Sequence, residues 1–170
     1  PKPATPGAVA RVCRELVDRL GVGADVPIGT VVGFPLGYDG TQTKVTAARC
    51  AIADGASEVD AVVNLTDVKN GDFAKVTAEI AALKEAVGDH ILKVIVETCC
   101  LTEEEKIALC RCVTEGGADF IKTSTGFGSA GATHEDIALF RRHIGHGVQI
   151  KAAGGIRTIE DMKRYLEEGC

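Results

Sequence analysis

The stretch Asp119-Phe120-Ile121-Lys122-Thr123-Ser124-Thr125-Gly126 decides the fold of this chain and points to its chemistry. Its apolar start predicts a buried strand over residues 118–123, with Lys122 near the end of that strand. The next predicted strand, residues 148–152, carries a second lysine at the matching place, Lys151. Lysine is depleted in strands and is almost never fully buried without a partner. Two such lysines on adjacent strands indicate an amine whose pKa is lowered for covalent chemistry.

Strand and helix signals alternate along the rest of the chain. Further apolar, β-branched strands are predicted over residues 28–34, 58–64 and 91–97. Helices with a 3.6-residue period are predicted over residues 8–20, 41–54, 72–87, 103–115, 134–144 and 159–168. Three of them begin with a capping pattern, in which an acid follows a threonine by three residues, at Thr102, Thr133 and Thr158. Strand–helix units that recur about every thirty residues predict an α/β fold with a parallel sheet.

Two folds accommodate five parallel strands, an open doubly wound sheet and a TIM (β/α)8 barrel. The parity of the polar side chains favours the barrel. One face of four successive strands carries polar groups, among them Asp60, Lys93, Lys122 and Lys151. A strand covered by helices on both sides should be apolar on both faces. A barrel interior that opens into an active site at its carboxyl mouth accommodates the polar face, whereas an open sheet would bury these charges under helices at considerable cost.

The composition is that of one globular domain and disfavours several functional classes. The 170 residues are enough to bury a substantial core. A net charge of −5 and the absence of a Lys/Arg run argue against a nucleic-acid partner. No apolar stretch approaches the length of a membrane span, so no membrane association is expected. Seven irregularly spaced cysteines predict reduced thiols in a cytoplasmic protein rather than a disulfide framework.

A pair of lysines is sufficient to prepare an amine for Schiff-base formation. Lowering a lysine pKa from roughly 10.4 to about 7 requires roughly 4 kcal/mol. A second ammonium about 5 Å away supplies on the order of 3 kcal/mol at an effective dielectric of about 20, and desolvation supplies the rest. Asp60, on a nearby strand, is placed to move protons through water. The alternative is a satisfied ion network in the barrel centre that comprises Asp60, Lys93, Glu97 and Lys122. We favour that alternative for Lys93 and Glu97, but not for Lys122 and Lys151.

Glycines follow both lysine-bearing strands, Gly126 after one and Gly154-Gly155 after the other. Glycine lets a backbone N–H approach an anion closely, and barrel loops after late strands often bind phosphate. A plain strand-to-helix turn explains Gly-Gly equally well. The segment 126–131 also spells G-x-G-x-x-G, but the helix cap at Thr133 follows the motif instead of lying in it, which disfavours dinucleotide binding. The four histidines form no strand-end cluster, so no metal site is predicted.

Taken in order, five segments resemble the deoxyribose-phosphate aldolases, a family of class I (Schiff-base) aldolases with a TIM-barrel fold. The segments are Val32-Gly33-Phe34-Pro35-Leu36-Gly37, Gly55-Ala56-Ser57-Glu58-Val59-Asp60, Leu92-Lys93-Val94-Ile95-Val96-Glu97-Thr98, Gly117-Ala118 followed by the opening stretch, and Ile150-Lys151-Ala152-Ala153-Gly154-Gly155-Ile156-Arg157-Thr158. They cover most of the chain from residue 28 onward. Their combination is specific, although no single segment is.

The resemblance implies a reaction and assigns roles to residues. The reaction is the reversible cleavage of 2-deoxy-D-ribose 5-phosphate to D-glyceraldehyde 3-phosphate and acetaldehyde, with no metal or organic cofactor. Lys122 is implied to form the imine, Lys151 to lower its pKa, and Asp60 to relay protons. The implied phosphate and substrate contacts are Gly126, Gly154, Gly155 and the Thr125 hydroxyl. A homo-oligomer is compatible with this assignment.

The resemblance places the five predicted strands as the third to the seventh of eight. We therefore expect a single barrel domain, residues 1–170, that is incomplete at both ends. A barrel without three of its strands has open edges and an exposed interior. Two other interpretations stay open for that reason. One is a different phosphate-binding barrel lyase or isomerase, and the other is a non-catalytic barrel fragment.

Overall fold

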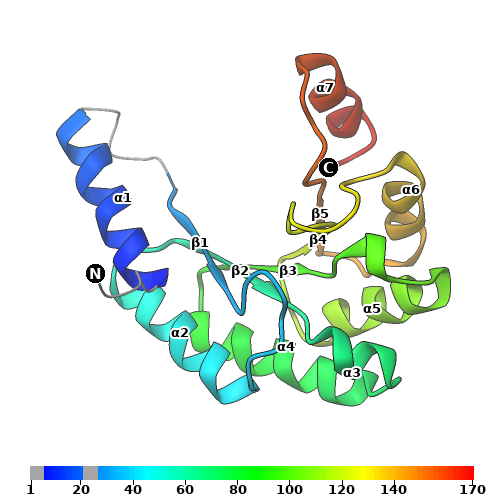
Figure 1. Ribbon diagram of the computed structural model, residues 1–170, viewed down its shortest axis with the longest axis horizontal. Coiled ribbons are helices and arrows are strands. Elements are labelled where there is room, and N and C mark those ends of the chain that lie inside the picture. Colours follow the sequence, from blue (N-terminus) through cyan, green and yellow to red (C-terminus); the bar gives the residue numbers. More distant parts are fainter. Residues whose placement is uncertain (1–5, 21–26) are drawn as a thin grey trace.

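The computed structural model describes residues 6–20 and 27–170. Figure 1 shows strands and helices that alternate along the chain and together form an open arc. The elements are, in order, α1 (Pro6–Leu20), β1 (Gly29–Val32), α2 (Thr41–Ala53), β2 (Glu58–Val62), α3 (Leu65–Lys69), α4 (Phe73–Val87), β3 (Ile91–Ile95), the 3-10 helix η1 (Thr98–Cys100), α5 (Glu103–Glu115), β4 (Phe120–Lys122), α6 (His134–His143), β5 (Gln149–Lys151) and α7 (Ile159–Glu167). The five strands and six helices that the sequence predicts are all present, and α3 and η1 are additional.

The five strands form one parallel sheet in the order β1-β2-β3-β4-β5. A doubly wound sheet would reverse its strand order at a switch point, and this sheet does not. The helices lie along the convex side of the arc, and the strands line its concave side (Figure 1). Strand order and helix placement are those of part of a (β/α)8 barrel, which confirms the predicted fold class.

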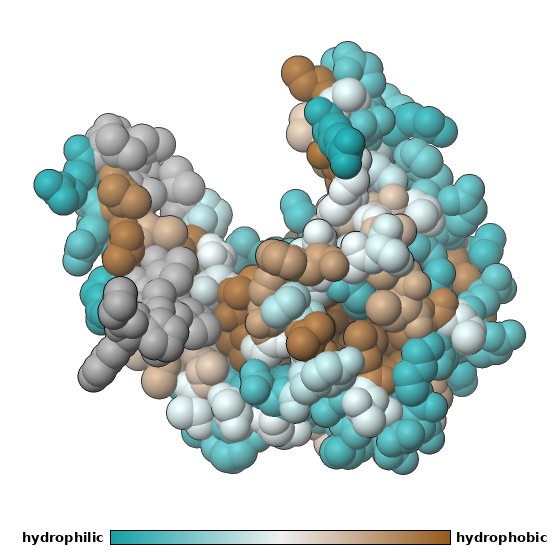
Figure 2. Space-filling view, viewed as in Figure 1, coloured by the Kyte–Doolittle hydropathy of each residue, from teal (hydrophilic) through white to brown (hydrophobic). Residues whose placement is uncertain are grey.

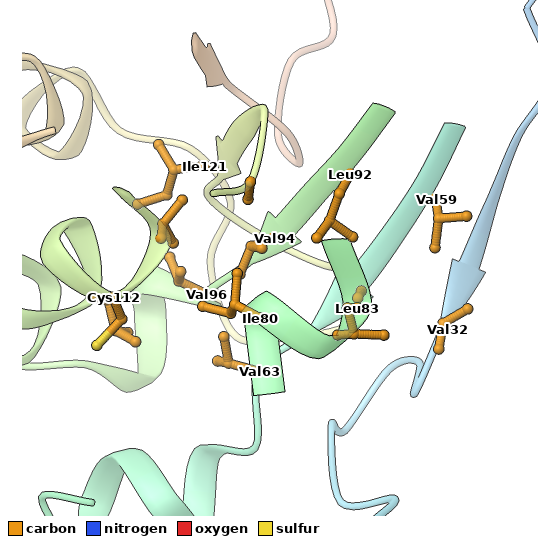
Figure 3. Close-up of a cluster of buried hydrophobic side chains, with 14 of the residues drawn as sticks. Val32, Val59, Val63, Ile80, Leu83, Leu92, Val94, Val96, Cys112 and Ile121 are labelled. Carbon is orange, nitrogen blue, oxygen red and sulfur yellow. The ribbon is translucent and has the colours of Figure 1, made fainter. Parts of the chain in front are cut away.

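The main hydrophobic core lies between the convex face of the sheet and the helices. Val59, Leu92 and Ile121 are fully buried and come from three neighbouring strands. Figure 3 shows them facing Ile80 and Leu83 of α4. Side chains alternate between the two faces of a strand, so the residues between these apolar positions point to the concave side. This core therefore fixes which polar side chains face the barrel interior.

The concave side carries the polar groups that parity predicts. Asp60 forms ion pairs with both Lys93 and Lys122 there. Figure 2 shows the molecule hollowed between the arm that contains α1 and the arm that contains α7. The register aligns Asp60 with Lys93 and, one layer higher, Lys122 with Lys151. The expected polar interior face is thus confirmed.

All five strands end one or two residues earlier than the sequence predicts, and for two of them the structure shows why. The predicted strand 58–64 ends at Val62, because Asn64 is the N-cap of α3 and its side chain accepts a hydrogen bond from Thr66 N at 3.0 Å. The predicted strand 91–97 ends at Ile95, and Glu97 adopts a left-handed backbone instead. Asn64 and Glu97 are both polar, and each makes side-chain hydrogen bonds outside the sheet instead of continuing the strand. Apolar alternation alone carries no signal for that departure.

The threonine caps behave as predicted, with one difference. Thr102 and Thr158 form reciprocal capping boxes with the acids three residues on. Thr133 accepts a hydrogen bond from Asp136 N, but the Asp136 carboxylate pairs with Lys106 Nζ at 2.6 Å. That ion pair links the start of α6 to α5. A tertiary contact therefore replaces half of the local capping motif.

The seven cysteines all lie in the described residues and are free thiols. Burial raises the pKa of Cys110 to about 12, so this thiol stays protonated and unreactive at neutral pH. Within residues 6–20 and 27–170, no helix is both long and apolar enough to cross a bilayer.

A buried ion pair ties α2 to β2 and α4. The Lys44 side chain is 0% exposed, and its Nζ lies 2.6 Å from Glu79 Oε1 and 2.9 Å from the Val62 carbonyl oxygen. Thr41 Oγ1 donates to the other Glu79 oxygen at 2.8 Å. Burying charges is costly unless each is paired and hydrogen-bonded, and both charges meet that condition here.

Lys44→Met is expected to lower the free energy of unfolding by about 3–5 kcal/mol, because it leaves the Glu79 carboxylate buried without its cation. Urea unfolding followed by circular dichroism measures the loss. The double substitution Lys44→Met with Glu79→Leu should recover much of it, since no unpaired charge then remains.

The control is Lys69→Met, which removes a pair of similar length, 2.7 Å to Glu105, from an exposed site. Exposed pairs contribute at most about 1 kcal/mol. Equal losses at Lys44 and Lys69 would contradict the importance of burial.

Candidate active site

Asp60 is the centre of the charged groups on the concave face. It lies in the middle of β2, where the pleat turns its side chain inward. Its Oδ2 lies 2.6 Å from Lys122 Nζ on β4, and its Oδ1 lies 3.1 Å from Lys93 Nζ on β3. The three side chains are largely buried, with 11–16% of each exposed. One carboxylate thus bridges two ammonium groups from two different strands.

Lys93 is held as a cation. It also pairs with Glu58, so two carboxylates share its ammonium. Burial by itself lowers the pKa of Lys93, but hydrogen bonds and charge attraction from Glu58 and Asp60 outweigh it and raise the pKa above its usual value. An ammonium that stays charged at neutral pH is not a nucleophile. Of the two lysines on Asp60, Lys122 is therefore the better candidate for covalent chemistry.

Lys151 lies beside Lys122 in the register of the sheet, at the end of β5. Unlike Lys122 it is exposed, and within the described part of the chain no side chain forms an ion pair with its ammonium. It lines a cavity of about 300 Å³ together with Phe120 and Tyr165. The structure thus brings the two lysines to neighbouring positions in different surroundings, one paired and one open.

The predicted ion network is confirmed in part. Asp60 and Lys93 are members, as expected, and so is Lys122, for which the sequence favours covalent chemistry instead. Glu97 is not, and the second acid is Glu58. Glu58 precedes Asp60 by two residues and so shares its strand face, which was a usable signal. Glu97 was placed in the network because its strand was expected to continue, and the strand ends before it.

Glu97 instead contacts the segment that follows β4. Its carboxylate accepts hydrogen bonds from the Thr125 hydroxyl and from Thr125 N, the latter at 3.3 Å. Thr125 Oγ1 in turn accepts from Phe127 N at 3.1 Å. A threonine hydroxyl has a single proton to donate. In this arrangement the hydroxyl of Thr125 can offer an incoming ligand only an acceptor.

The loops after β4 and β5 interlock through glycine. Gly126, Gly154 and Gly155 have left-handed φ angles of 89°, 78° and 77°, which glycine adopts without steric cost. Gly131 packs so closely that a Cβ built on it would lie 2.3 Å from the Gly154 carbonyl. Ala132 N donates to the carbonyl oxygens of Ala153 and Gly154 at 3.0 and 3.1 Å. The predicted glycine site is thus a shaped stretch of backbone whose N–H groups can approach an anion.

The G-x-G-x-x-G pattern over residues 126–131 has a packing explanation. Gly126 supplies a left-handed turn, whereas Gly128 and Gly131 allow close approach to neighbouring segments. Helix α6 begins only at His134, after the motif. A dinucleotide fingerprint needs the helix to open within it. The pattern therefore serves the loop and not a nucleotide.

Comparison with known proteins gives the geometry a context. A model of the DeoC/LacD family of aldolases matches residues 4–170. The deoxyribose-phosphate aldolase of Clostridium botulinum (strain Eklund 17B / Type B) is 63% identical over 148 residues, which are 87% of this chain and 67% of that protein. The deoxyribose-phosphate aldolase of Clostridioides difficile (strain 630) is 55% identical over 145 residues, or 85% of this chain and 66% of that protein.

Solved structures agree with the sequence matches. An aldolase called QR15 superposes with a TM-score of 0.88 at 35% identity, covering 96% of this chain and 72% of that one. The tetrameric deoxyribose phosphate aldolase from Aeropyrum pernix gives a TM-score of 0.81 at 26% identity, covering 96% and 68%. The chain spans about two thirds of the length of the curated relatives it matches.

Gly131→Ala is expected to disturb the interlocked loops, because the added methyl group has no room beside Gly154. Overpacking of this kind costs typically about 1–3 kcal/mol. The amide of Ala132, which bonds across to the β5 loop, should then exchange its hydrogen faster. Native-state hydrogen exchange checks this.

The matched control is Gly40→Ala, since a Cβ at Gly40 would meet nothing within 4 Å. Gly40 has an ordinary φ of −63°. If Gly131→Ala were as harmless as Gly40→Ala, the contact between the loops would not constrain their shape.

Proposed function

The chain belongs to the DeoC/LacD family of aldolases, and we propose that its protein cleaves 2-deoxy-D-ribose 5-phosphate reversibly to D-glyceraldehyde 3-phosphate and acetaldehyde through a Schiff base on Lys122. The observation that carries the proposal is the contact of 2.6 Å between Lys122 Nζ and Asp60 Oδ2 on the concave face. It joins an amine to a proton acceptor at the place where parallel barrels hold their active sites.

The chemistry needs an amine, a proton carrier and an electron sink. The neutral Lys122 amine adds to the aldehyde carbon of the open-chain sugar, and the resulting carbinolamine takes up one proton and loses water to give an iminium ion. Removal of the proton from the C3 hydroxyl breaks the C2–C3 bond, releases glyceraldehyde 3-phosphate and leaves the electron pair in an enamine. Protonation of the enamine carbon and hydrolysis release acetaldehyde and regenerate Lys122. Each step moves one proton, and Asp60 is within reach to move it directly or through water.

Asp60 and Lys151 have opposite electrostatic effects on Lys122. Asp60 favours the charged form of Lys122, but it shares its carboxylate with Lys93, which weakens that attraction. The Lys151 ammonium beside Lys122 in the register disfavours a second positive charge there. We assign to Lys151 the role of keeping a fraction of Lys122 uncharged near neutral pH.

We place the phosphate of the substrate at the loops after β4 and β5. The support is the left-handed backbone of Gly126, Gly154 and Gly155, which frees N–H groups for an anion. Thr125 lies beside this backbone, and its oxygen can accept a hydrogen bond from a sugar hydroxyl while its proton stays on Glu97. No metal or organic cofactor enters this scheme.

The setting of the enzyme is part of the same proposal. A cytoplasmic location is supported by seven free thiols, which persist in a reducing compartment. Assembly into a homo-oligomer is supported by the tetrameric relative from Aeropyrum pernix.

Borohydride reduction in the presence of acetaldehyde should trap a covalent adduct on Lys122, because reduction converts the imine into a stable secondary amine. Peptide mass spectrometry of the full-length protein locates the adduct. Lys122→Met should abolish both adduct and turnover and leave the circular dichroism spectrum unchanged.

The control is Lys163→Met, which removes an exposed lysine of α7 and should leave trapping intact. Product analysis with 2-deoxyribose 5-phosphate separates the proposal from another phosphate-binding barrel lyase or isomerase. A folded full-length protein that shows neither adduct nor cleavage would be a non-catalytic barrel.

Lys151→Met is expected to move the rising limb of the pH–rate profile to higher pH, because Lys122 then loses its proton less readily. Solvent screens the charge of the exposed Lys151, so the shift should be smaller than a buried ammonium at the same position would cause. The profile of Lys163→Met should match that of the unsubstituted protein. An unchanged profile in Lys151→Met would show that the two lysines are not coupled.

A further inference from the structure

The backbone of Glu97 is strained. Its φ and ψ are 57° and 66°, and among the described residues no other non-glycine residue has a positive φ. A left-handed conformation costs such a residue on the order of 1–3 kcal/mol and persists only where its surroundings enforce it. Strain of this kind concentrates at functional sites, and Glu97 follows β3, the strand of Lys93, by two residues.

The Glu97 side chain is a buried carboxylate without a cation. It is 5% exposed, and no lysine, arginine or histidine pairs with it within residues 6–20 and 27–170. Its two oxygens accept instead from Thr125, one from the hydroxyl and one from the backbone N–H. A carboxylate accepts from both donors, whereas a glutamine amide would accept only from Thr125 N and would have to donate its NH2 group to the Thr125 oxygen. The carboxylate therefore fixes the direction of the hydroxyl hydrogen bond, and an amide would reverse it and remove the charge.

The segment after β4 rests directly on Glu97. A Cβ built on Gly128 would lie 2.6 Å from Cys99 Sγ and 3.2 Å from the Glu97 carboxyl group. Thr125 Oγ1 also accepts from Phe127 N, which closes the turn around Gly126. Packing at Gly128 and two hydrogen bonds to the Glu97 side chain thus hold the segment from Thr125 to Gly128 in place.

We infer that Glu97 is a positioning residue that fixes the segment 125–128 and thereby presents the Gly126 backbone to the phosphate of the substrate. The inference rests on the proposed function and extends it to a residue outside the charged network. Lys122 is held by strand β4 and by Asp60, independently of this segment. Glu97 should therefore govern binding of the phosphorylated end and leave Schiff-base formation intact.

The test compares two substrates in full-length protein that carries Glu97→Gln. KM for 2-deoxyribose 5-phosphate should rise about tenfold or more, as loss of a charge-assisted hydrogen bond implies, while kcat changes by less than about threefold. KM for unphosphorylated 2-deoxyribose should rise by less than about threefold, because that sugar has no phosphate for the Gly126 backbone to bind. The borohydride adduct of acetaldehyde on Lys122 should form as before.

Thr125→Val provides a second variant that leaves the strained backbone of Glu97 untouched. It should raise KM more for the phosphorylated sugar than for the free one, and the two effects should be less than additive in the double variant, because both changes break the hydrogen bond between Glu97 and the Thr125 hydroxyl. Glu104→Gln, an exposed glutamate in the first turn of α5, is the matched control and should change neither KM.

Three results would overturn the inference. These are an unchanged KM in both Glu97→Gln and Thr125→Val, an equal loss for the two sugars, and additive effects in the double variant. Loss of the proposed function is distinguishable from these results. In that case the unsubstituted protein itself would form no adduct and cleave no sugar phosphate.

Discussion

The charged interior depends on one shared carboxylate. Asp60 holds Lys122 and Lys93 at once, and Glu58 completes a neutral set of two acids and two ammonium groups. Such a set tolerates burial because each charge is paired. Adding Lys151 at the next strand leaves one positive charge in excess. This group of side chains thus carries one net positive charge while the buried charges within it remain compensated.

Asp60 also contributes to the different environments of Lys93, Lys122 and Lys151, which are chemically identical side chains. Lys93 is fixed as a cation by two acids, and the raised pKa of its ammonium follows from them. Lys122 has one acid partner, which it shares, and Lys151 is exposed. Of the two lysines inside the barrel, Lys122 therefore has the weaker ion pairing, and its single partner, Asp60, is also a proton acceptor. These ion pairs require all three strands in one register, so the hydrophobic core that fixes the sheet also fixes the partners of each lysine.

The sequence predicts these features where the signal is local. Alternation of apolar and polar residues is enough to put Asp60, Lys93 and Lys122 on one face, and matching strand positions put Lys122 beside Lys151. Strand ends are different. Glu97 continues the alternation, yet it leaves the sheet for Thr125, which lies 28 residues away in the chain. Whether a polar residue extends a strand or ends it depends on such distant partners, and no pattern within the strand records them.

The loops at the mouth show why that distant information matters for function. The loop after β4 contacts Glu97 after β3 on one side and Gly154 after β5 on the other. Each contact brings one chain segment closer to the next than a side chain at Gly128 or Gly131 would allow. Close approach of this kind fixes backbone N–H groups without using a cation. The glycines, through close packing, and Glu97, through hydrogen bonds, therefore both constrain the loop after β4. They hold the loop in one backbone conformation without using a lysine of the charged network.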